Sequence, residues 1–165
     1  MFPEEFLGLN LSHILTVLAV AASPISELRG AIPIAVFVFH FPWYYAFLLA
    51  IIGNLLPVPF ILLFLNTISR YISKIGILKR TLHWLFERTK RRGKLIEKYG
   101  SIGLALFVAI PLPMTGAWTG SLAAVLLGLK FKPALLSIFV GILIAGIIVT
   151  CATLLGWSIF GLSKV

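Results

Sequence analysis

The chain has 165 residues and a formal net charge of +9, yet 60% of its residues are hydrophobic and only 12% are charged. Its mean hydropathy of +1.08 is well above that of a soluble domain, and its apolar runs are long enough to cross a bilayer. These properties exclude a soluble globular protein and predict one multi-pass membrane domain over residues 1–165.

The composition also argues against catalysis and metal binding. All five acidic residues are glutamates, the single cysteine excludes an intrachain disulfide, and the three histidines have no metal-ligand spacing. No Ser–His or Cys–His pair is expected at one membrane depth. We therefore expect neither an enzyme nor a metal site, and no cofactor other than a coupling proton.

Two apolar stretches come first, at residues 11–22 and 27–41, separated by Ser23, Pro24, Ile25 and Ser26. A 12-residue helix rises only about 18 Å, which is short of a hydrocarbon core about 30 Å thick. Serine followed by proline is typical of a helix start, so a half-helix is expected to begin at Ser23 and Pro24. We interpret residues 11–41 as a re-entrant helical hairpin, and one discontinuous span is the alternative.

Residues 43–65 are long enough to span, with Trp43 and Tyr44 as interfacial aromatics at one end and a kink expected at Pro57 and Pro59. Residues 66–100 hold most of the Lys and Arg residues, between apolar residues at three- and four-residue steps. This pattern predicts an amphipathic helix on the cytoplasmic membrane surface, in contact with anionic lipid and not with nucleic acid.

The second half repeats the first in outline. Apolar stretches at 101–112 and 117–129 surround a Pro111 to Gly116 break, and residues 133–160 form a second long span. Aligning Pro24 with Pro113 gives a repeat of about 89 residues. The predicted fold is thus all-α, an inverted repeat in which each half (11–65 and 101–160) is a re-entrant hairpin plus a transmembrane helix. Small residues at Gly141, Ala145 and Gly146 indicate a close helix crossing in the last span.

Glu27 and Arg29 are opposite charges within an otherwise apolar region. On a regular helix, residues two apart point to nearly opposite sides, although Pro33 cannot donate to the Arg29 carbonyl and a distorted turn would allow a pair. An ionisable residue within the membrane needs a partner or water. Two interpretations follow, a structural ion pair or a functional site in which Arg29 binds an anion and Glu27 takes up a proton.

Further polar residues and prolines complete the candidate site. Asn54 is expected to bond a hairpin tip or contact substrate, and Trp118 to line a cavity or pack. The expected substrate-binding residues are Arg29, Ser26, Thr115, Gly116, Asn54 and Trp118, and the expected tip prolines are Pro24, Pro33, Pro111 and Pro113.

Three motifs occur in order along the chain: "SELRGAIP" at 26–33, "IGNLLPVP" at 52–59 and "YGSIGLALFVAIPLPMTGAWTG" at 99–120. In these motifs the chain resembles the small multidrug export protein family and, more distantly, the DedA superfamily of membrane proteins. The resemblance implies inverted re-entrant hairpins with charged residues near their tips. It assigns functional positions to Glu27, Arg29, Pro111, Pro113, Thr115 and Gly116.

The DedA resemblance further implies a flippase-like transporter of phosphate-bearing lipids linked to the proton gradient. Transport of an anionic lipid is therefore the first hypothesis. Proton-coupled export of cationic drugs through Glu27 is the second, and a non-transporting membrane scaffold with structural charges is the third. Two spans give hairpins little shielding from lipid, so we also expect a homo-oligomer.

Overall fold

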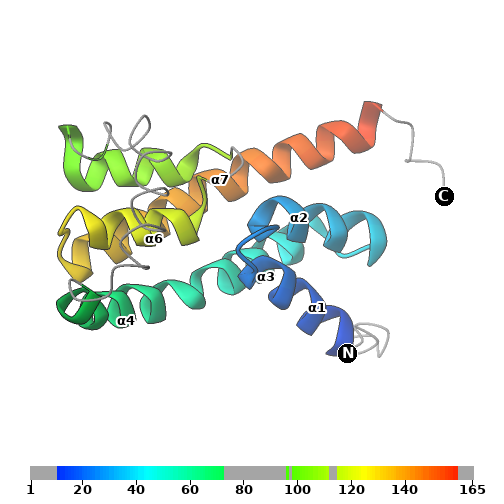
Figure 1. The fold of residues 1–165 in the computed structure, drawn as a ribbon. Helices are drawn as coiled ribbons and strands as arrows, with labels where there is room; N and C mark the ends of the chain where they lie inside the picture. Colours follow the sequence, from blue (N-terminus) through cyan, green and yellow to red (C-terminus); the bar gives the residue numbers. More distant parts are fainter. Residues whose placement is uncertain (1–10, 73–95, 97, 112–114, 160–165) are drawn as a thin grey trace, which may run out of the picture. The chain divides into compact units, whose positions relative to one another are not determined.

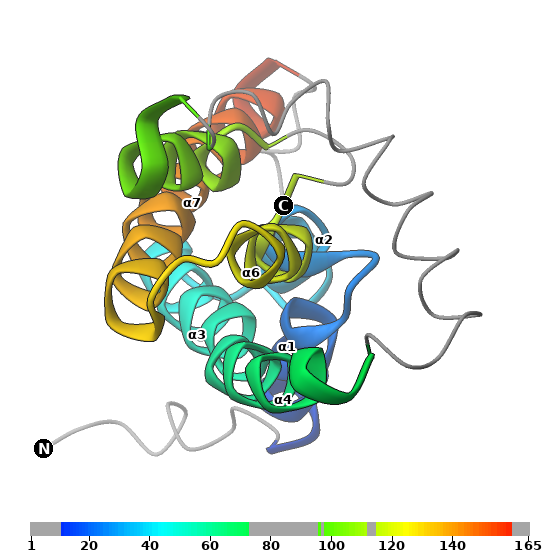
Figure 2. The same cartoon turned by 60° about the vertical axis from the view of Figure 1, so that its left-hand side comes forward.

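A computed structural model describes residues 11–72, 96, 98–111 and 115–159 (Figures 1 and 2). Every regular element within these ranges is helical, which confirms the predicted all-α class. Most of the predicted basic amphipathic connector lies outside the described residues. The helices in chain order are α1 (Leu11–Ala22), α2 (Glu27–Pro33), the π-helix η2 (Ile34–Val38), α3 (Trp43–Leu55), α4 (Pro57–Ile72), the helix Lys98–Ala109, α6 (Ala117–Leu126) and α7 (Phe131–Ile159).

These helices form two compact units. Unit 1 contains residues 11–56 and 145–159, and unit 2 contains the described residues between 57 and 144. In unit 1, α1 packs against both α2 and α3, and α2 also packs against α3. In unit 2, α4 packs against α6.

Helix α1 ends at Ala22, where the sequence analysis places the end of the first apolar stretch. Pro24 is in the turn that follows, and the Ser23 side-chain oxygen accepts a hydrogen bond from the Ser26 N–H at 3.2 Å. This is the bond that an N-cap serine makes, but regular helix begins only at Glu27, three residues after Pro24, the expected first helical residue. The positive φ of Glu27, +48°, is the reason for the delay because it interrupts the helical backbone at that residue.

The second short helix changes type along its length. Pro33 has no N–H to donate to the Arg29 carbonyl, and directly after it the backbone widens into the π-helix η2. The Phe39 N–H closes this segment by donating to the Ile34 carbonyl at 3.2 Å. The α-helical hydrogen-bond pattern therefore ends at Pro33, and a π-helical pattern follows it. π-Helical turns are frequent at functional sites.

Two apolar helices are long enough to cross a membrane, Trp43–Phe64 and Phe131–Gly156. The first comprises α3 and the start of α4, and its interruption at Leu56 is just before Pro57, close to the predicted kink. The two short helices α1 and Lys98–Ala109 are apolar but below spanning length. The order short helix, break, short helix, long helix thus occurs twice, at about the predicted 89-residue spacing.

A matching glycine crossing lies in each half. A Cβ built on Gly53 of α3 would lie 2.7 Å from Ala21 Cβ and 2.8 Å from the Leu18 carbonyl oxygen of α1. A Cβ built on Gly141 of α7 would lie 2.6 Å from Val108 Cβ and 2.8 Å from the Ala105 carbonyl oxygen. In both halves, therefore, glycine lets the long helix approach the backbone of the preceding short helix. The crossing at Gly141 was predicted from the small residues of the last span, whereas the crossing at Gly53 was not.

The described residues have an apolar core, but they also expose many large apolar side chains. Large apolar residues are exposed along both long helices, whereas several polar ones are buried. Such a surface suits a hydrocarbon solvent, in which exposed leucine and phenylalanine side chains carry no penalty. The exposed apolar set includes Leu48, Ile52, Phe60, Phe64, Leu136, Ile147 and Leu155, and the buried polar set is Glu27, Asn54, Thr115, Ser121, Ser137, Thr150 and Thr153.

Candidate functional site

Glu27 and Arg29 form an ion pair at the start of α2. Arg29 Nη2 lies 3.5 Å from Glu27 Oε2, and the carboxylate side chain is only 5% exposed whereas the guanidinium side chain is 26% exposed. The two charges thus differ in accessibility. Arg29 has donor N–H groups on the more open side of the pair, while Glu27 is held in the interior.

The pair forms because Glu27 does not have regular helical geometry. Its φ of +48° is in the left-handed region, which costs a residue with a Cβ about 1–3 kcal/mol and is found mainly at functional sites. On a regular helix the side chains of Glu27 and Arg29 would point to nearly opposite sides. The left-handed backbone at Glu27 instead directs its side chain toward Arg29. The distortion lies at Glu27 itself, two residues before Arg29, where the turn that Pro33 was expected to distort begins.

Ser26 is the last residue of the turn before α2 and directly precedes Glu27 in the chain. Its carbonyl accepts a hydrogen bond from the Gly30 N–H at 3.1 Å, and its Cβ would lie 2.9 Å from a Cβ built on Gly30. Glycine at position 30 therefore allows the turn to fold closely against the first turn of α2. Within unit 1 the structure thus brings Ser26, Glu27 and Arg29 together, with Pro24 in the same turn and Pro33 at the end of α2.

Asn54 belongs to α3 in the same unit. It is 1% exposed, and its Oδ1 accepts no hydrogen bond from the residues that the structure describes. Residues 112–114 of the second break lie outside the described residues, so the expected bond of Asn54 to a hairpin tip stays a prediction. Its role as a substrate contact stays a prediction.

The second group of predicted site residues lies in unit 2. Thr115 is 2% exposed, and its hydroxyl donates to the Ile110 carbonyl at 2.6 Å, which closes the break after the helix Lys98–Ala109. Gly116 immediately precedes α6, as predicted, and accepts hydrogen bonds from the Gly120 N–H at 2.9 Å and the Thr119 hydroxyl at 3.2 Å. Trp118 is half-buried in the first turn of α6 and Pro111 is half-buried in the break, while Pro113 lies outside the described residues.

Replacing Thr115 with valine tests this closure. Because the hydroxyl hydrogen bond is short and the residue is buried, we expect a loss of about 1–2 kcal/mol of folding free energy. Serine at the same position should restore most of this loss. Thermal unfolding in detergent measures the difference, and equal stability of the valine variant and the native chain would contradict the structural role of this bond.

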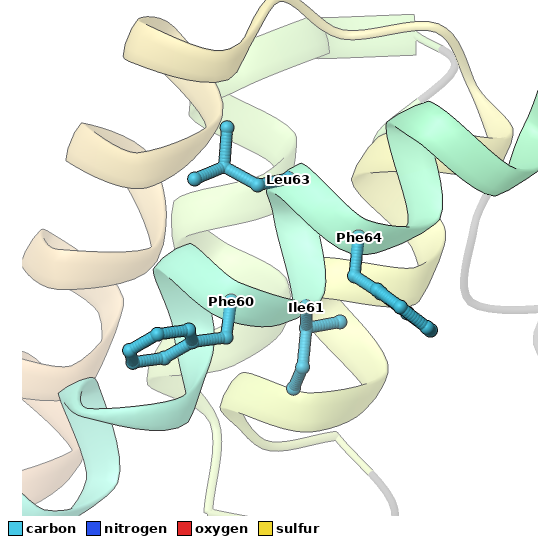
Figure 3. Close-up of a pocket in the computed structure, with 4 residues that line it drawn as sticks. All are labelled: Phe60, Ile61, Leu63 and Phe64. Atoms are coloured by element: carbon cyan, nitrogen blue, oxygen red, sulfur yellow. The ribbon is translucent and has the colours of Figure 1, made fainter.

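The described part of the chain holds no metal-binding cluster. No group of three His, Cys, Asp or Glu residues there could hold a metal ion, and Cys151 is exposed. A depression of about 460 Å³ on unit 2 is lined by Phe60, Ile61, Leu63 and Phe64. All four belong to α4 (Figure 3), and their apolar chemistry suits lipid chains.

Sequence reasoning missed two features of unit 1. His13 of α1 stacks on Phe39 with ring centroids 4.2 Å apart, and Phe39 in turn contacts Phe41, which tethers the end of η2 to α1. The positive φ of Glu27 was also missed, since no glycine or asparagine signals it. In the sequence, a histidine near the end of a membrane segment is only weak evidence that its ring stacks on another aromatic ring.

The comparisons with known proteins give one assignment. A family model described as "Putative small multi-drug export protein" matches residues 27–148, which is well over half of the chain and begins at Glu27. No curated protein and no solved structure matches the chain. The match includes both charged residues, the first long helix, the greater part of the second and the Thr115 break, so the chain belongs to the small multi-drug export protein family and is a membrane transporter.

Proposed function

We propose that this transporter moves an anionic, phosphate-bearing lipid across the membrane, with Arg29 binding the headgroup. The observation that carries the proposal is the unequal exposure of the pair, 26% for the Arg29 side chain and 5% for that of Glu27. A ligand approaching the pair meets the guanidinium first. Arginine donates paired N–H groups in a planar fork that matches phosphate oxygens.

Glu27 is the proposed proton acceptor. In the ion pair its carboxylate and a substrate phosphate compete for the same guanidinium. Protonation of Glu27 removes its charge and frees Arg29 for the phosphate, whereas deprotonation restores the pair and expels the headgroup. Headgroup binding is therefore expected to strengthen as the pH falls, which links lipid movement to the proton gradient.

The proposal includes a membrane arrangement. Residues 11–41 and 101–129 are the proposed re-entrant hairpins of opposite orientation. Ser26 of the first hairpin and Thr115, Gly116 and Trp118 of the second are the further proposed substrate contacts. The basic connector 66–100 lies on the cytoplasmic side of the cell membrane and collects anionic lipids from the inner leaflet. A homo-oligomer shields the hairpins from the hydrocarbon.

Proton-coupled export of cationic drugs is the second candidate, and the family's description as a multi-drug export protein favours drug export. In that mechanism Glu27 would bind the cation when deprotonated. Arg29, at 3.5 Å from Glu27 and more exposed, would repel such a substrate. The two candidates therefore predict opposite roles for the two residues.

Substitution of Arg29 distinguishes them. We expect Arg29→Gln to abolish binding of a fluorescent polyprenyl phosphate in proteoliposomes. Arg29→Lys retains the charge but loses the fork, so it should bind about tenfold more weakly, the equivalent of one charge-assisted hydrogen bond. Glu27→Gln mimics the protonated acid and should bind lipid without pH dependence.

The same proteoliposomes provide the opposing test with a quaternary ammonium dye. Pumping of the dye that is lost in Glu27→Gln and improved in Arg29→Gln would establish cation export instead. Unchanged lipid binding by Arg29→Gln would contradict the proposed headgroup site.

A further inference from the structure

The first turn of α1 and the end of η2 meet at one aromatic contact. The rings of His13, near the start of α1, and Phe39, which caps η2, stack with their centroids 4.2 Å apart and an interplanar angle of 14°. Both residues are half-buried. Because they are far apart in the sequence, the chain between them folds back on itself, and the stack joins its two ends.

Two further aromatic contacts continue from this stack to α3. The Phe39 and Phe41 rings lie 5.9 Å apart, and Phe41 meets the Tyr45 ring edge-on at 5.4 Å. Phe41 is 5% exposed, and its N–H donates to the Ala35 carbonyl of η2 at 2.9 Å. The chain of rings thus connects the start of α1, the end of η2 and the start of α3.

The stack lies beside the part of α3 that carries interfacial aromatics. Trp43 and Tyr44 come between Phe41 and Tyr45 in the chain and are exposed, as residues at a membrane–water interface are. Water at the interface supplies protons, which the hydrocarbon core does not. Histidine is the side chain whose charge ordinarily changes between about pH 5 and 8. His13 is therefore placed where the pH of the aqueous phase acts on it.

Few charged groups belong to the described elements that pack against α1, which are α2, η2 and α3. The titratable or charged side chains on these elements and on the residues that join them are Glu27, Arg29, His40, Tyr44 and Tyr45. Glu27 and Arg29 pair with each other, beyond the opposite end of α1 from His13. Glu4 and Glu5 precede α1 and lie outside the described residues. Among the described residues, the ring that contacts His13 is that of Phe39.

We propose that the His13–Phe39 stack is a pH-sensitive latch, which protonation of His13 tightens. A neutral imidazole stacks on phenylalanine as one aromatic ring on another, whereas a cation within about 6 Å of the ring face adds a cation–π attraction. Only the protonated form makes this attraction, so it stabilises the latch in acid and is lost as the pH rises through the range in which histidine titrates. At exposed sites a cation–π contact favours the closed arrangement about two- to fivefold.

The latch is connected to the charged pair through one continuous element, because α2 runs directly into η2 at Pro33. A headgroup that separates Arg29 from Glu27 acts on the first turn of this element, and the latch holds its last residue. The role of the latch in transport rests on the proposed function: lipid release on this side of the membrane requires the latch to open, so acid on this side slows release. The pH response of the latch itself rests only on the stack.

A double-mutant cycle on the full chain in detergent tests the latch without any lipid substrate. His13→Phe keeps a stacked ring but cannot take up a proton. The ratio of folding equilibrium constants, native over His13→Phe, should be about two- to fivefold higher at about pH 5.5 than at about pH 8. In the Phe39→Leu background the same comparison should give a ratio that does not change with pH. Glu4, Glu5 and Glu27 are present in every variant, so their own titration cancels.

His40→Asn is the matched control. His40 is adjacent to Phe39 and exposed, and its φ of +53° is in the left-handed region, which asparagine tolerates. This variant loses a neighbouring histidine but should keep the full pH response. If the ratio is the same at both pH values, or if its change persists in the Phe39→Leu background, the proposed latch is wrong.

Proteoliposomes test the role in transport separately. Acidifying the side opposite the basic connector should slow flipping of a fluorescent polyprenyl phosphate about two- to fivefold in the native chain, but not in Phe39→Leu. Equal slowing of both proteins would overturn the role of the latch in lipid release. A native chain that flips no lipid would contradict the proposed function, whereas the cycle in detergent would still decide whether the latch exists.

Discussion

Replacing Arg29 with methionine is expected to destabilise the folded protein by about 3 kcal/mol, because it leaves the Glu27 carboxylate buried without its counter-ion. The carboxylate side chain is 5% exposed and has little access to solvent. Replacing Glu27 with leucine should cost less, about 1 kcal/mol, since the unpaired Arg29 is 26% exposed and can orient toward water. Glutamate and leucine carry the same left-handed backbone penalty, which therefore cancels in this comparison.

The double variant with Glu27→Leu and Arg29→Met separates structure from function. Apolar replacement of a buried pair is often neutral or stabilising, so the double variant should be at least as stable as the Arg29→Met single variant and close to the native chain. It should nevertheless lose all lipid binding. Unfolding in detergent and binding in proteoliposomes measure the two properties on the same preparation. A double variant that folds and still transports lipid would show that the ion pair is structural and would contradict its role as the headgroup site.

Replacing Gly53 with alanine is expected to have the second large effect, a loss of about 3 kcal/mol or more of stability. The added Cβ would lie 2.8 Å from the Leu18 carbonyl oxygen and 2.7 Å from Ala21 Cβ, and neither atom is the end of a flexible side chain. The higher helix propensity of alanine offsets only about 1 kcal/mol of this loss, so the steric clash makes the net effect on stability unfavourable. The equivalent substitution of Gly141 should be similarly damaging because it faces the Ala105 carbonyl oxygen at the same distance.

Gly156 provides the matched control for both substitutions. It lies in α7, and among the described residues no atom comes within 4 Å of a Cβ built on it. Gly156→Ala should therefore be neutral or stabilising by up to about 1 kcal/mol. Equal unfolding temperatures for the Gly53, Gly141 and Gly156 variants would contradict the two crossings.

Much of the helical layout was predictable because the apolar runs and prolines set helix bounds locally. The range 11–22 coincides with α1, the interruption at Leu56 comes directly before Pro57, and Gly116 precedes α6 as expected. These features depend on a few neighbouring residues and on the missing N–H of proline. The repeated element order follows from the same signals, while the opposite orientation of the two halves stays a prediction.

The site was predictable in composition but not in geometry. Two charges in an apolar region identify Glu27 and Arg29 at once, yet their contact depends on a left-handed glutamate that no local rule favours. The π-helix after Pro33 and the unsatisfied Asn54 oxygen also depend on tertiary packing. The Gly53 crossing was missed because one glycine in an apolar helix has no distinctive pattern until its neighbour on α1 is known.

The most direct test of anionic-lipid transport is the rate at which the purified native chain flips a fluorescent polyprenyl phosphate in proteoliposomes, beside the Arg29→Gln variant and protein-free vesicles. We predict flipping by the native chain that quickens when the side from which lipid is taken is acidified, and no flipping above the protein-free rate with Arg29→Gln. Flipping at the protein-free rate by a folded native chain, or equal rates for the native chain and the variant, would contradict the proposal.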